Sequence, residues 1–338
     1  MYGRRRRLLL GAVLAPLLAC AAFATARQLL NDELHAQRQG PRVRVGSAYP
    51  SLGQWPQRGQ GALVLGNGRP AASPREQPVP IASLAKVMTA YLILERYPLS
   101  GAQEGFTIVV TAAQAHAAAQ DAARGESAVA VRAGERLTER QLLQALLIPS
   151  GNNIARMLAA LLAGSETSFL AEMNAEARAL GMDRTFYTDP SGFDPSTVST
   201  AADQLRVFRR AMRFRVFRQI VSTASVTLPV VGAVTNFNPL IAEGYAGKTG
   251  SDSAGGGGCL AFFTGVTVGG RRLTAVGVVL GQGEGSRTSA ILAAAGEAAK
   301  RLVDSVAPAN RVGPGQVREP PAPQPALATR SDASVLAP

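Results

Sequence analysis

Apolar residues recur at helical spacing through the middle and the end of this chain. Residues 139–148 and 152–163 each carry an apolar face, and the break between them holds Pro149-Ser150-Gly151, which cannot continue a helix. A further periodic segment ends at Gly181, a typical position for a helix-terminating glycine. Helices are predicted over residues 139–148, 152–163, 166–180, 201–218 and 286–306.

Strand patterns lie on both sides of this helical region. Residues 61–73 predict a strand and a hairpin turn at Asn67-Gly68, and residues 258–281 predict two strands joined by Gly269-Gly270. Residues 187–197 form a turn-rich loop. This order predicts an α/β protein of the α+β type, in which an antiparallel sheet is flanked by helices and a mostly helical subdomain is inserted at about residues 100–200.

The two ends of the chain differ from its middle. Residues 1–26 begin with four arginines, continue with an uncharged apolar run and end in small residues, as a secretory signal peptide does. A retained N-terminal membrane anchor is the alternative, and Cys20 offers a weak lipoprotein cleavage site. The Pro/Ala-rich residues 307–338 are typical of a disordered tail or a wall-spanning spacer. We therefore expect one exported domain over residues 27–306, in the periplasm or on the extracellular face of the cytoplasmic membrane.

Composition narrows the chemistry. The chain is 46% hydrophobic and 17% charged, as a globular protein would be, with a formal net charge of +12. Without the leader it keeps one cysteine, Cys259, so no internal disulfide can form. One cysteine and two histidines, His35 and His116, argue against a zinc or iron site built by the protein, and we expect no cofactor and no metal.

An arginine-rich segment indicates a binding protein as the alternative to an enzyme. Residues 206–218 (RVFRRAMRFRVFR) hold six arginines and three phenylalanines, which can bind nucleic acid or an anionic membrane. Leu205, Phe208, Met212 and Val216 keep helical spacing, however, which favours a packed amphipathic helix with a basic outer face. Export argues against nucleic acid as a partner and leaves anionic wall polymers as the expected kind.

The segment PIASLAKVMTAYLILE (residues 80–95) is apolar almost throughout but contains Ser83 and Lys86. Only three of the 35 basic residues are lysines, so a lysine here is not a default positive charge. A buried lysine can lose its proton, which arginine does not, and can then act as a general base. On a helix the two side chains share a face, so a base stands beside a hydroxyl that needs one to become a nucleophile. The alternative is an N-capping serine followed by a lysine that extends its amine to solvent.

Two further short motifs carry polar residues at breaks in the pattern. Ser150-Gly151-Asn152 lies between two predicted helices, where Ser150 is either a helix N-cap or part of a polar site. Lys248-Thr249-Gly250 lies at or near the start of a strand, followed by glycines that would let a substrate backbone approach. The alternative for Lys248 is a solvated strand-end lysine.

Taken together, Ser-x-x-Lys, Ser-Gly-Asn and Lys-Thr-Gly in this order resemble the serine penicillin-recognising enzymes. Residues 164–194 and 199–212 narrow the resemblance to the D-alanyl-D-alanine carboxypeptidases among the low-molecular-mass penicillin-binding proteins. The resemblance covers about residues 40–305. It implies a β-lactamase/transpeptidase-like fold, peptidoglycan stem peptides as substrates and β-lactams as covalent inhibitors.

The resemblance also implies a role for each matching residue. Ser83 would be the acylated nucleophile and Lys86 its general base. Ser150 and Asn152 would relay a proton to the leaving amine and orient the substrate and Lys86. The expected substrate-binding residues are Lys248, Thr249, Gly250, Ser251 and Arg287, of which Lys248 and Thr249 would hold the terminal carboxylate and Arg287 would assist. The backbone N–H groups of Ser83 and Ser251 would form the oxyanion hole.

Rival activities remain open at this point. A D,D-endopeptidase that cuts peptide cross-links would use the same chemistry in a cleft of different shape. A serine β-lactamase is less favoured. The β-lactamase class with the most similar motifs carries a Glu-x-x-Leu-Asn loop before Lys-Thr-Gly, and this chain has no such string. After Lys-Thr-Gly the stretch SDSAGGGGCL is longer and richer in glycine than is usual for the family, which leaves substrate preference and rate undecided.

Overall fold

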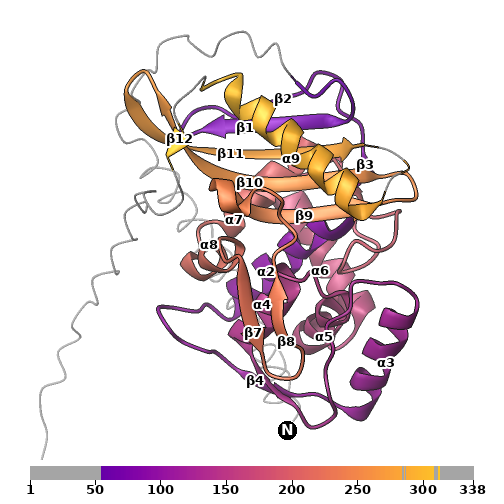
Figure 1. Ribbon diagram of the computed structural model, residues 1–338. Helices are drawn as coiled ribbons and strands as arrows, with labels where there is room; N and C mark the ends of the chain where they lie inside the picture. The colour runs from indigo at the N-terminus through magenta and orange to yellow at the C-terminus, as the bar shows by residue number, and fades with distance from the viewer. Residues whose placement is uncertain (1–54, 284, 286, 308–310, 313–338) are drawn as a thin grey trace, which may run out of the picture. The chain divides into compact units, whose positions relative to one another are not determined.

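The computed structural model describes residues 55–283, 285, 287–307 and 311–312. The predicted leader, residues 1–26, lies outside these residues, and so does most of the predicted tail. Within the described part the chain combines helices with an antiparallel sheet, as the apolar pattern predicted (Figure 1). No single helix there has the length and hydropathy of a membrane span. Only the pair α5 (Asn152–Ala163) and α6 (Glu166–Ala179), bent by 86°, has both.

The sheet has six antiparallel strands in the order β12-β10-β11-β1-β2, and β9 also pairs with β10. The strands are β1 (Gln60–Leu65), β2 (Ala71–Ala72), β9 (Ala246–Asp252), β10 (Gly257–Val268), β11 (Arg271–Gln282) and β12 (Arg311–Val312). Both predicted hairpins are confirmed, and Gly269 and Gly270 adopt the positive φ angles, 56° and 75°, that a two-residue turn requires. Strand β12 lies beyond residue 306, where the expected domain ended. Its two residues nevertheless belong to the sheet, since they pair with Gly265 and Val266 of β10.

Helices pack on both faces of this sheet. Helix α9 (Thr288–Asp304), the predicted closing helix, packs on β10 and β11 and buries one apolar core that includes Leu260, Phe262 and Ala299. A larger core lies on the other side, where α7 (Ala201–Ala211) contacts β1 and β11. Here the short 3₁₀ helix η2 (Ala82–Leu84) contacts β9, which brings the Ser-x-x-Lys segment against the Lys-Thr-Gly strand.

The remaining helices build the predicted helical part around α2 (Ala85–Arg96). They are α3 (Ala112–Ala123), α4 (Glu139–Leu147), α5 (Asn152–Ala163), α6 (Glu166–Ala179) and α8 (Arg215–Val221), with η3 (Ile241–Glu243) as a further short turn. Three two-stranded ribbons complete the fold: β3 (Val79–Pro80) with β6 (Val198–Ser199), β4 (Thr107–Val109) with β5 (Arg136–Thr138), and β7 (Ser225–Leu228) with β8 (Gly232–Thr235). Nine of the twelve residues of α2 are buried, which explains why its sequence is apolar on every side.

The arginine-rich segment is two helices rather than the single helix predicted over residues 201–218. Helix α7 ends at Ala211, and Phe214 takes an extended conformation before α8 begins. Leu205 and Phe208 are fully buried, whereas Arg206 is exposed. This segment is therefore a packed amphipathic unit with arginines on its outer side, which is the interpretation that its apolar spacing favoured.

Candidate active site

Ser83 lies in a tightly enclosed turn just ahead of α2. Ala82 adopts a left-handed φ of 46°, and Ser83 belongs to η2 rather than to the α-helix itself. Two glycines close in on this turn. A Cβ on Gly192 would lie 1.8 Å from the Ala82 carbonyl oxygen, and one on Gly250 would lie 3.2 Å from the Ser83 nitrogen. Only glycine allows this close approach, so the backbone of the Ser83 turn packs directly against β9 at Gly250.

Lys86 is fully buried in the first turn of α2, with its amine surrounded by three oxygens. The Nζ atom lies 2.7 Å from Ser83 Oγ, 2.7 Å from Asn152 Oδ1 and 2.9 Å from the Ser191 carbonyl oxygen. Burial, assisted by the charge of Lys248, holds the pKa of Lys86 well below its ordinary value of 10.5, although Asp189 and Glu126 act in the opposite direction. The alternative, in which this lysine extends to solvent, is wrong.

The Ser-Gly-Asn motif forms the sharp entry to α5. Gly151 is the residue that precedes the helix, and Ser150 before it has a left-handed φ of 63°, uncommon for a residue with a side chain. The alternative of Ser150 as the helix N-cap is therefore wrong. Its hydroxyl instead accepts a hydrogen bond from Lys248 Nζ at 2.9 Å. Asn152, also buried, directs its Oδ1 to Lys86.

Lys248 projects from β9 and is also buried, with 1% of its surface exposed. Its amine donates to Ser150 Oγ at 2.9 Å and to the Thr249 carbonyl oxygen at 2.8 Å. Burial lowers the pKa of Lys248 to about 7 from 10.5. The alternative of a solvated strand-end lysine is wrong, since this amine faces the helical side of the site.

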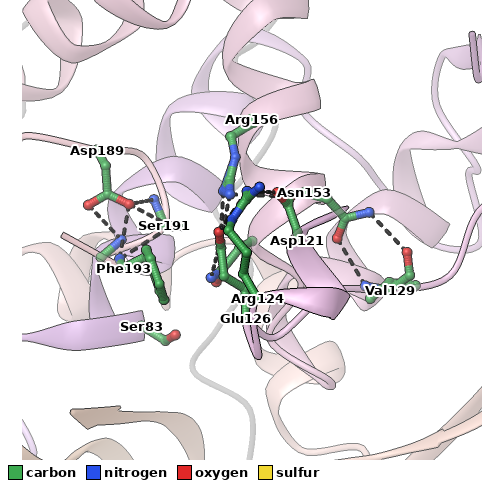
Figure 2. Close-up of polar contacts among 12 residues, drawn as sticks. Ser83, Asp121, Arg124, Glu126, Val129, Asn153, Arg156, Asp189, Ser191 and Phe193 are labelled. Atoms are coloured by element: carbon green, nitrogen blue, oxygen red, sulfur yellow. Dashed lines mark hydrogen bonds and ion pairs between the residues drawn. The ribbon is translucent and has the colours of Figure 1, made fainter. Parts of the chain in front are cut away.

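A carboxylate in the loop of residues 187–197 fixes the third partner of Lys86. Asp189 accepts backbone N–H groups from Ser191 at 3.1 Å, Gly192 at 3.0 Å and Phe193 at 3.0 Å (Figure 2). These bonds hold the loop so that the Ser191 carbonyl points at Lys86. The sequence marked this stretch only as a turn-rich loop. Its one usable signal was the Asp-Pro-Ser-Gly cluster, in which an aspartate commonly caps the following N–H groups.

Behind Asn152 lies a second group of charges that the sequence did not reveal. The Nδ2 atom of Asn152 donates to Glu126 Oε2 at 3.1 Å. Arg156 donates to the same oxygen at 2.6 Å, and Arg124 donates to Glu126 Oε1 at 3.1 Å (Figure 2). Glu126 is 26 residues away from Asn152 in the chain, so no local pattern connects them.

The other predicted residues take less defined positions. Thr249 and Gly250 are buried in β9, and Ser251 follows them in the same strand. Arg287 is exposed at the residue that precedes α9, so its role stays a prediction. Cys259 is buried in β10, and no cluster of three or more histidine, cysteine, aspartate or glutamate residues that could hold a metal ion occurs in the described ranges.

This arrangement can carry out nucleophilic chemistry without histidine or metal. A neutral amine has two N–H groups and one lone pair. Two carbonyl oxygens, those of Asn152 and Ser191, are placed to accept the N–H groups of Lys86, which leaves the lone pair toward the Ser83 hydroxyl. Such an amine can remove the hydroxyl proton.

Comparisons with known proteins agree with this geometry. The profile of the family described as D-alanyl-D-alanine carboxypeptidase matches residues 71–282. The carboxypeptidase DacB2 of Mycobacterium tuberculosis is 38% identical over 153 residues, 44% of this chain and 48% of that protein. A D-alanyl-D-alanine endopeptidase of Pseudomonas aeruginosa is 33% identical over 151 residues, 44% of this chain and 45% of that protein.

Thus the chain spans about half the length of the curated relatives it matches. Among solved structures, a single-site mutant of the Streptomyces K15 DD-transpeptidase superposes with a TM-score of 0.61 at 25% identity, covering 74% of this chain and 97% of that one. The predicted transpeptidase-like fold is confirmed by this likeness. Because the family profile spans well over half of the chain and includes all three motifs, this protein belongs to the D-alanyl-D-alanine carboxypeptidase family.

Proposed function

We propose that this protein is a serine-type D-Ala-D-Ala carboxypeptidase that removes the terminal D-alanine from peptidoglycan stem peptides. One observation carries the proposal: a fully buried lysine amine lies 2.7 Å from the hydroxyl of Ser83, and two carbonyl oxygens face its N–H groups. Burial holds the pKa of Lys86 well below its ordinary value of 10.5, which favours the neutral amine that a general base requires.

The reaction would proceed in two steps. Neutral Lys86 takes the Ser83 proton while Oγ bonds to the carbonyl carbon of the penultimate D-Ala, and the negative charge moves to the carbonyl oxygen. The backbone N–H groups of Ser83 and Ser251 would donate hydrogen bonds to this oxyanion. The C–N bond then breaks, the departing amine of D-alanine takes a proton by way of Ser150, and a water molecule later hydrolyses the Ser83 ester with the same base.

Lys248 and Thr249 are proposed to bind the terminal carboxylate of the substrate. The amine of Lys248 lies inside the site beside Ser150, and a carboxylate placed against it would restore its positive charge. Arg287 is proposed only as an assisting group at the outer end of this subsite. No cofactor takes part in this scheme.

Labelling with a fluorescent penicillin tests the nucleophile. The wild type should carry the label in a denaturing gel, and Ser83→Ala should carry none. Lys86→Arg should also remain unlabelled although it keeps the positive charge, because arginine does not release its proton. Equal labelling of the wild type and Ser83→Ala would overturn the assignment. A nitrocefin reaction that continues at a steady rate beyond a stoichiometric burst would instead favour a β-lactamase.

D,D-endopeptidase activity is the second candidate, because two matched relatives carry that name. Both activities share the acylation step and differ in what leaves the enzyme. A soluble peptide ending in D-Ala-D-Ala and a purified cross-linked dimer, given separately to the same preparation, distinguish them by the products released. Faster cleavage of the dimer would replace the carboxypeptidase proposal with the endopeptidase one.

We also propose that residues 1–26 direct export and that the enzyme works outside the cytoplasmic membrane, where stem peptides occur. The basic start and the apolar run support this proposal. The N-terminal sequence of the protein from the producing cell separates a cleaved leader from a retained anchor. Recovery of the intact leader in a cytoplasmic fraction would contradict export.

A further inference from the structure

Four charged residues form a nearly closed group on the far side of Asn152 from the lysine. Glu126 and Asp121 are buried, with 2% and 5% of their side chains exposed, whereas Arg156 and Arg124 reach toward solvent at 31% and 57%. Arg156 pairs with Glu126 at 2.6 Å and with Asp121 at 3.2 Å. Arg124 pairs with Asp121 at 2.5 Å and with Glu126 at 3.1 Å. Two acids are thus matched by two arginines.

This group touches the site at one atom pair. Glu126 Oε2 accepts from Asn152 Nδ2 at 3.1 Å, while Asn152 Oδ1 accepts from Lys86 Nζ at 2.7 Å. An ionised carboxylate can only accept hydrogen bonds, so it selects the amino end of the amide. If the amide turned by 180°, an oxygen would face the carboxylate, and an amino group would face the N–H of Lys86. Glu126 therefore decides which end of Asn152 the lysine meets.

We propose that Glu126, held by Arg156, is a positioning residue for acylation: it fixes the amide of Asn152 so that the lone pair of Lys86 stays directed at Ser83. This proposal rests on the proposed function of the same site. The Arg156 bonds matter because they hold the buried carboxylate in one orientation. The backbone here is fixed separately, since the Asn152 N–H donates to the Ser127 carbonyl at 2.7 Å.

Electrostatics provide a readout that a purely structural role would not move. The charged groups that act on Lys86 are Lys248, Asp189, Arg156 and Glu126. Arg156 lowers the pKa of Lys86, whereas Glu126 raises it. Removing one charge or the other should therefore move the acidic limb of the pH–rate profile in opposite directions.

The experiment measures the second-order rate constant for acylation by nitrocefin between about pH 5 and pH 10, with active protein counted by penicillin titration. Glu126→Ala should lower this constant by about tenfold to a hundredfold, since a misplacement of ~1 Å costs up to about 10²-fold. Glu126→Gln should recover most of the rate, because its carbonyl oxygen can still accept from Asn152. The acidic limb of the pH–rate profile of Glu126→Gln should lie roughly half a pH unit below that of the wild type, because the variant lacks the charge that raises the pKa of Lys86.

Arg156→Gln should move the acidic limb toward higher pH, because it removes a positive charge that lowers the pKa of Lys86, while Arg124 still holds the Glu126 carboxylate. Glu104→Gln is the matched control: its carboxylate also pairs with an arginine, Arg140, at 3.5 Å, and it should show the wild-type profile. The proposal is overturned if Glu126→Ala acylates at the wild-type rate, or if Glu126→Gln and Arg156→Gln shift the limb in the same direction. Labelling of Ser83→Ala would instead refute the proposed function itself, so the two failures are distinguishable.

Discussion

The buried amine of Lys248 should make the stability of this protein depend on pH in a specific way. Burial lowers the pKa of Lys248 from 10.5 in the unfolded chain to about 7 in the folded protein. Between these values the unfolded chain binds more protons than the folded protein does, so the free energy of unfolding must rise with pH. Below pH 7 the folded protein bears the full free-energy cost of burying a charged Lys248 amine, and this cost disappears as the pH approaches 10.5. Integrated from about pH 7 to about pH 9.5, the relief is about 3 kcal/mol.

Lys248→Met isolates this contribution. Methionine has a similar length but no proton to lose, so the variant should lack the rise of about 3 kcal/mol between these pH values. The variant also loses the hydrogen bonds to Ser150 Oγ and the Thr249 carbonyl, at about 1 kcal/mol each, and this loss hardly changes with pH. The variant should therefore compare most favourably with the wild type near pH 7, and its relative stability should fall as the pH rises.

Urea unfolding followed by far-UV circular dichroism at several pH values gives the two free energies, and their difference removes the shared groups on which Lys248 does not act. Lys86 is the exception: without Lys248 its pKa is lowered less, so its own rise in stability with pH is also smaller in the variant, in the same direction as the predicted effect. Lys300→Met is the control, because that lysine lies at the surface, paired with Glu243 at 3.0 Å. A difference between the wild type and Lys248→Met that stays the same at pH 7 and pH 9.5 would refute the argument that burial suppresses this charge.

Two further predictions concern the backbone of the site and a carboxylate away from it. Gly192→Ala places a Cβ 1.8 Å from the Ala82 carbonyl oxygen, at a residue whose φ is 74°, so the Ser83 turn must move. The rate of acylation by nitrocefin should fall at least about tenfold, and the free energy of unfolding in urea should fall by about 1–3 kcal/mol. A wild-type rate of acylation would contradict the contact between Gly192 and Ala82. Burial raises the pKa of Glu139 to about 7 from 4.5, so this group destabilises the fold progressively as the pH rises from 4.5 to 7, and the full penalty applies above pH 7. Glu139→Gln should therefore stabilise the protein by up to about 3 kcal/mol at pH 8 and by little at pH 5, and equal effects in urea unfolding at the two pH values would count against it.

Much of this site was predictable because its chemistry depends on residue types that are rare in the chain. The chain has only three lysines, and two of them lie in the Ser-x-x-Lys and Lys-Thr-Gly motifs, so the sequence itself indicated Lys86 and Lys248. The structure shows that both are buried. The spacing of three residues put Ser83 and Lys86 on one side of a turn whether that turn is α or 3₁₀. The order of the three motifs also indicated the family to which the family profile assigns the chain.

Other parts were beyond reach because they depend on contacts between distant segments or on backbone angles. Nothing in the local pattern indicates that Ser150 adopts a left-handed conformation, which removes it from the N-cap and turns its hydroxyl to Lys248. The break in the arginine-rich helix occurs where the backbone of Phe214 becomes extended, whereas the apolar spacing alone continues through this position. The pairing of Glu126 with Asn152 joins a loop to a helix and has no periodic signature.

The two buried amines also suggest how substrate binding and base strength are connected. Lys248 lowers the pKa of Lys86, and this effect is strongest when Lys248 carries its charge. In the free protein the pKa of Lys248 is about 7, so near neutral pH it is charged only part of the time. A substrate carboxylate at Lys248 would favour its charged form, but the carboxylate also brings a negative charge, which acts on the pKa of Lys86 in the opposite direction. We therefore expect substrate binding to restore the charge of Lys248, while the low pKa of Lys86 continues to depend mainly on its burial.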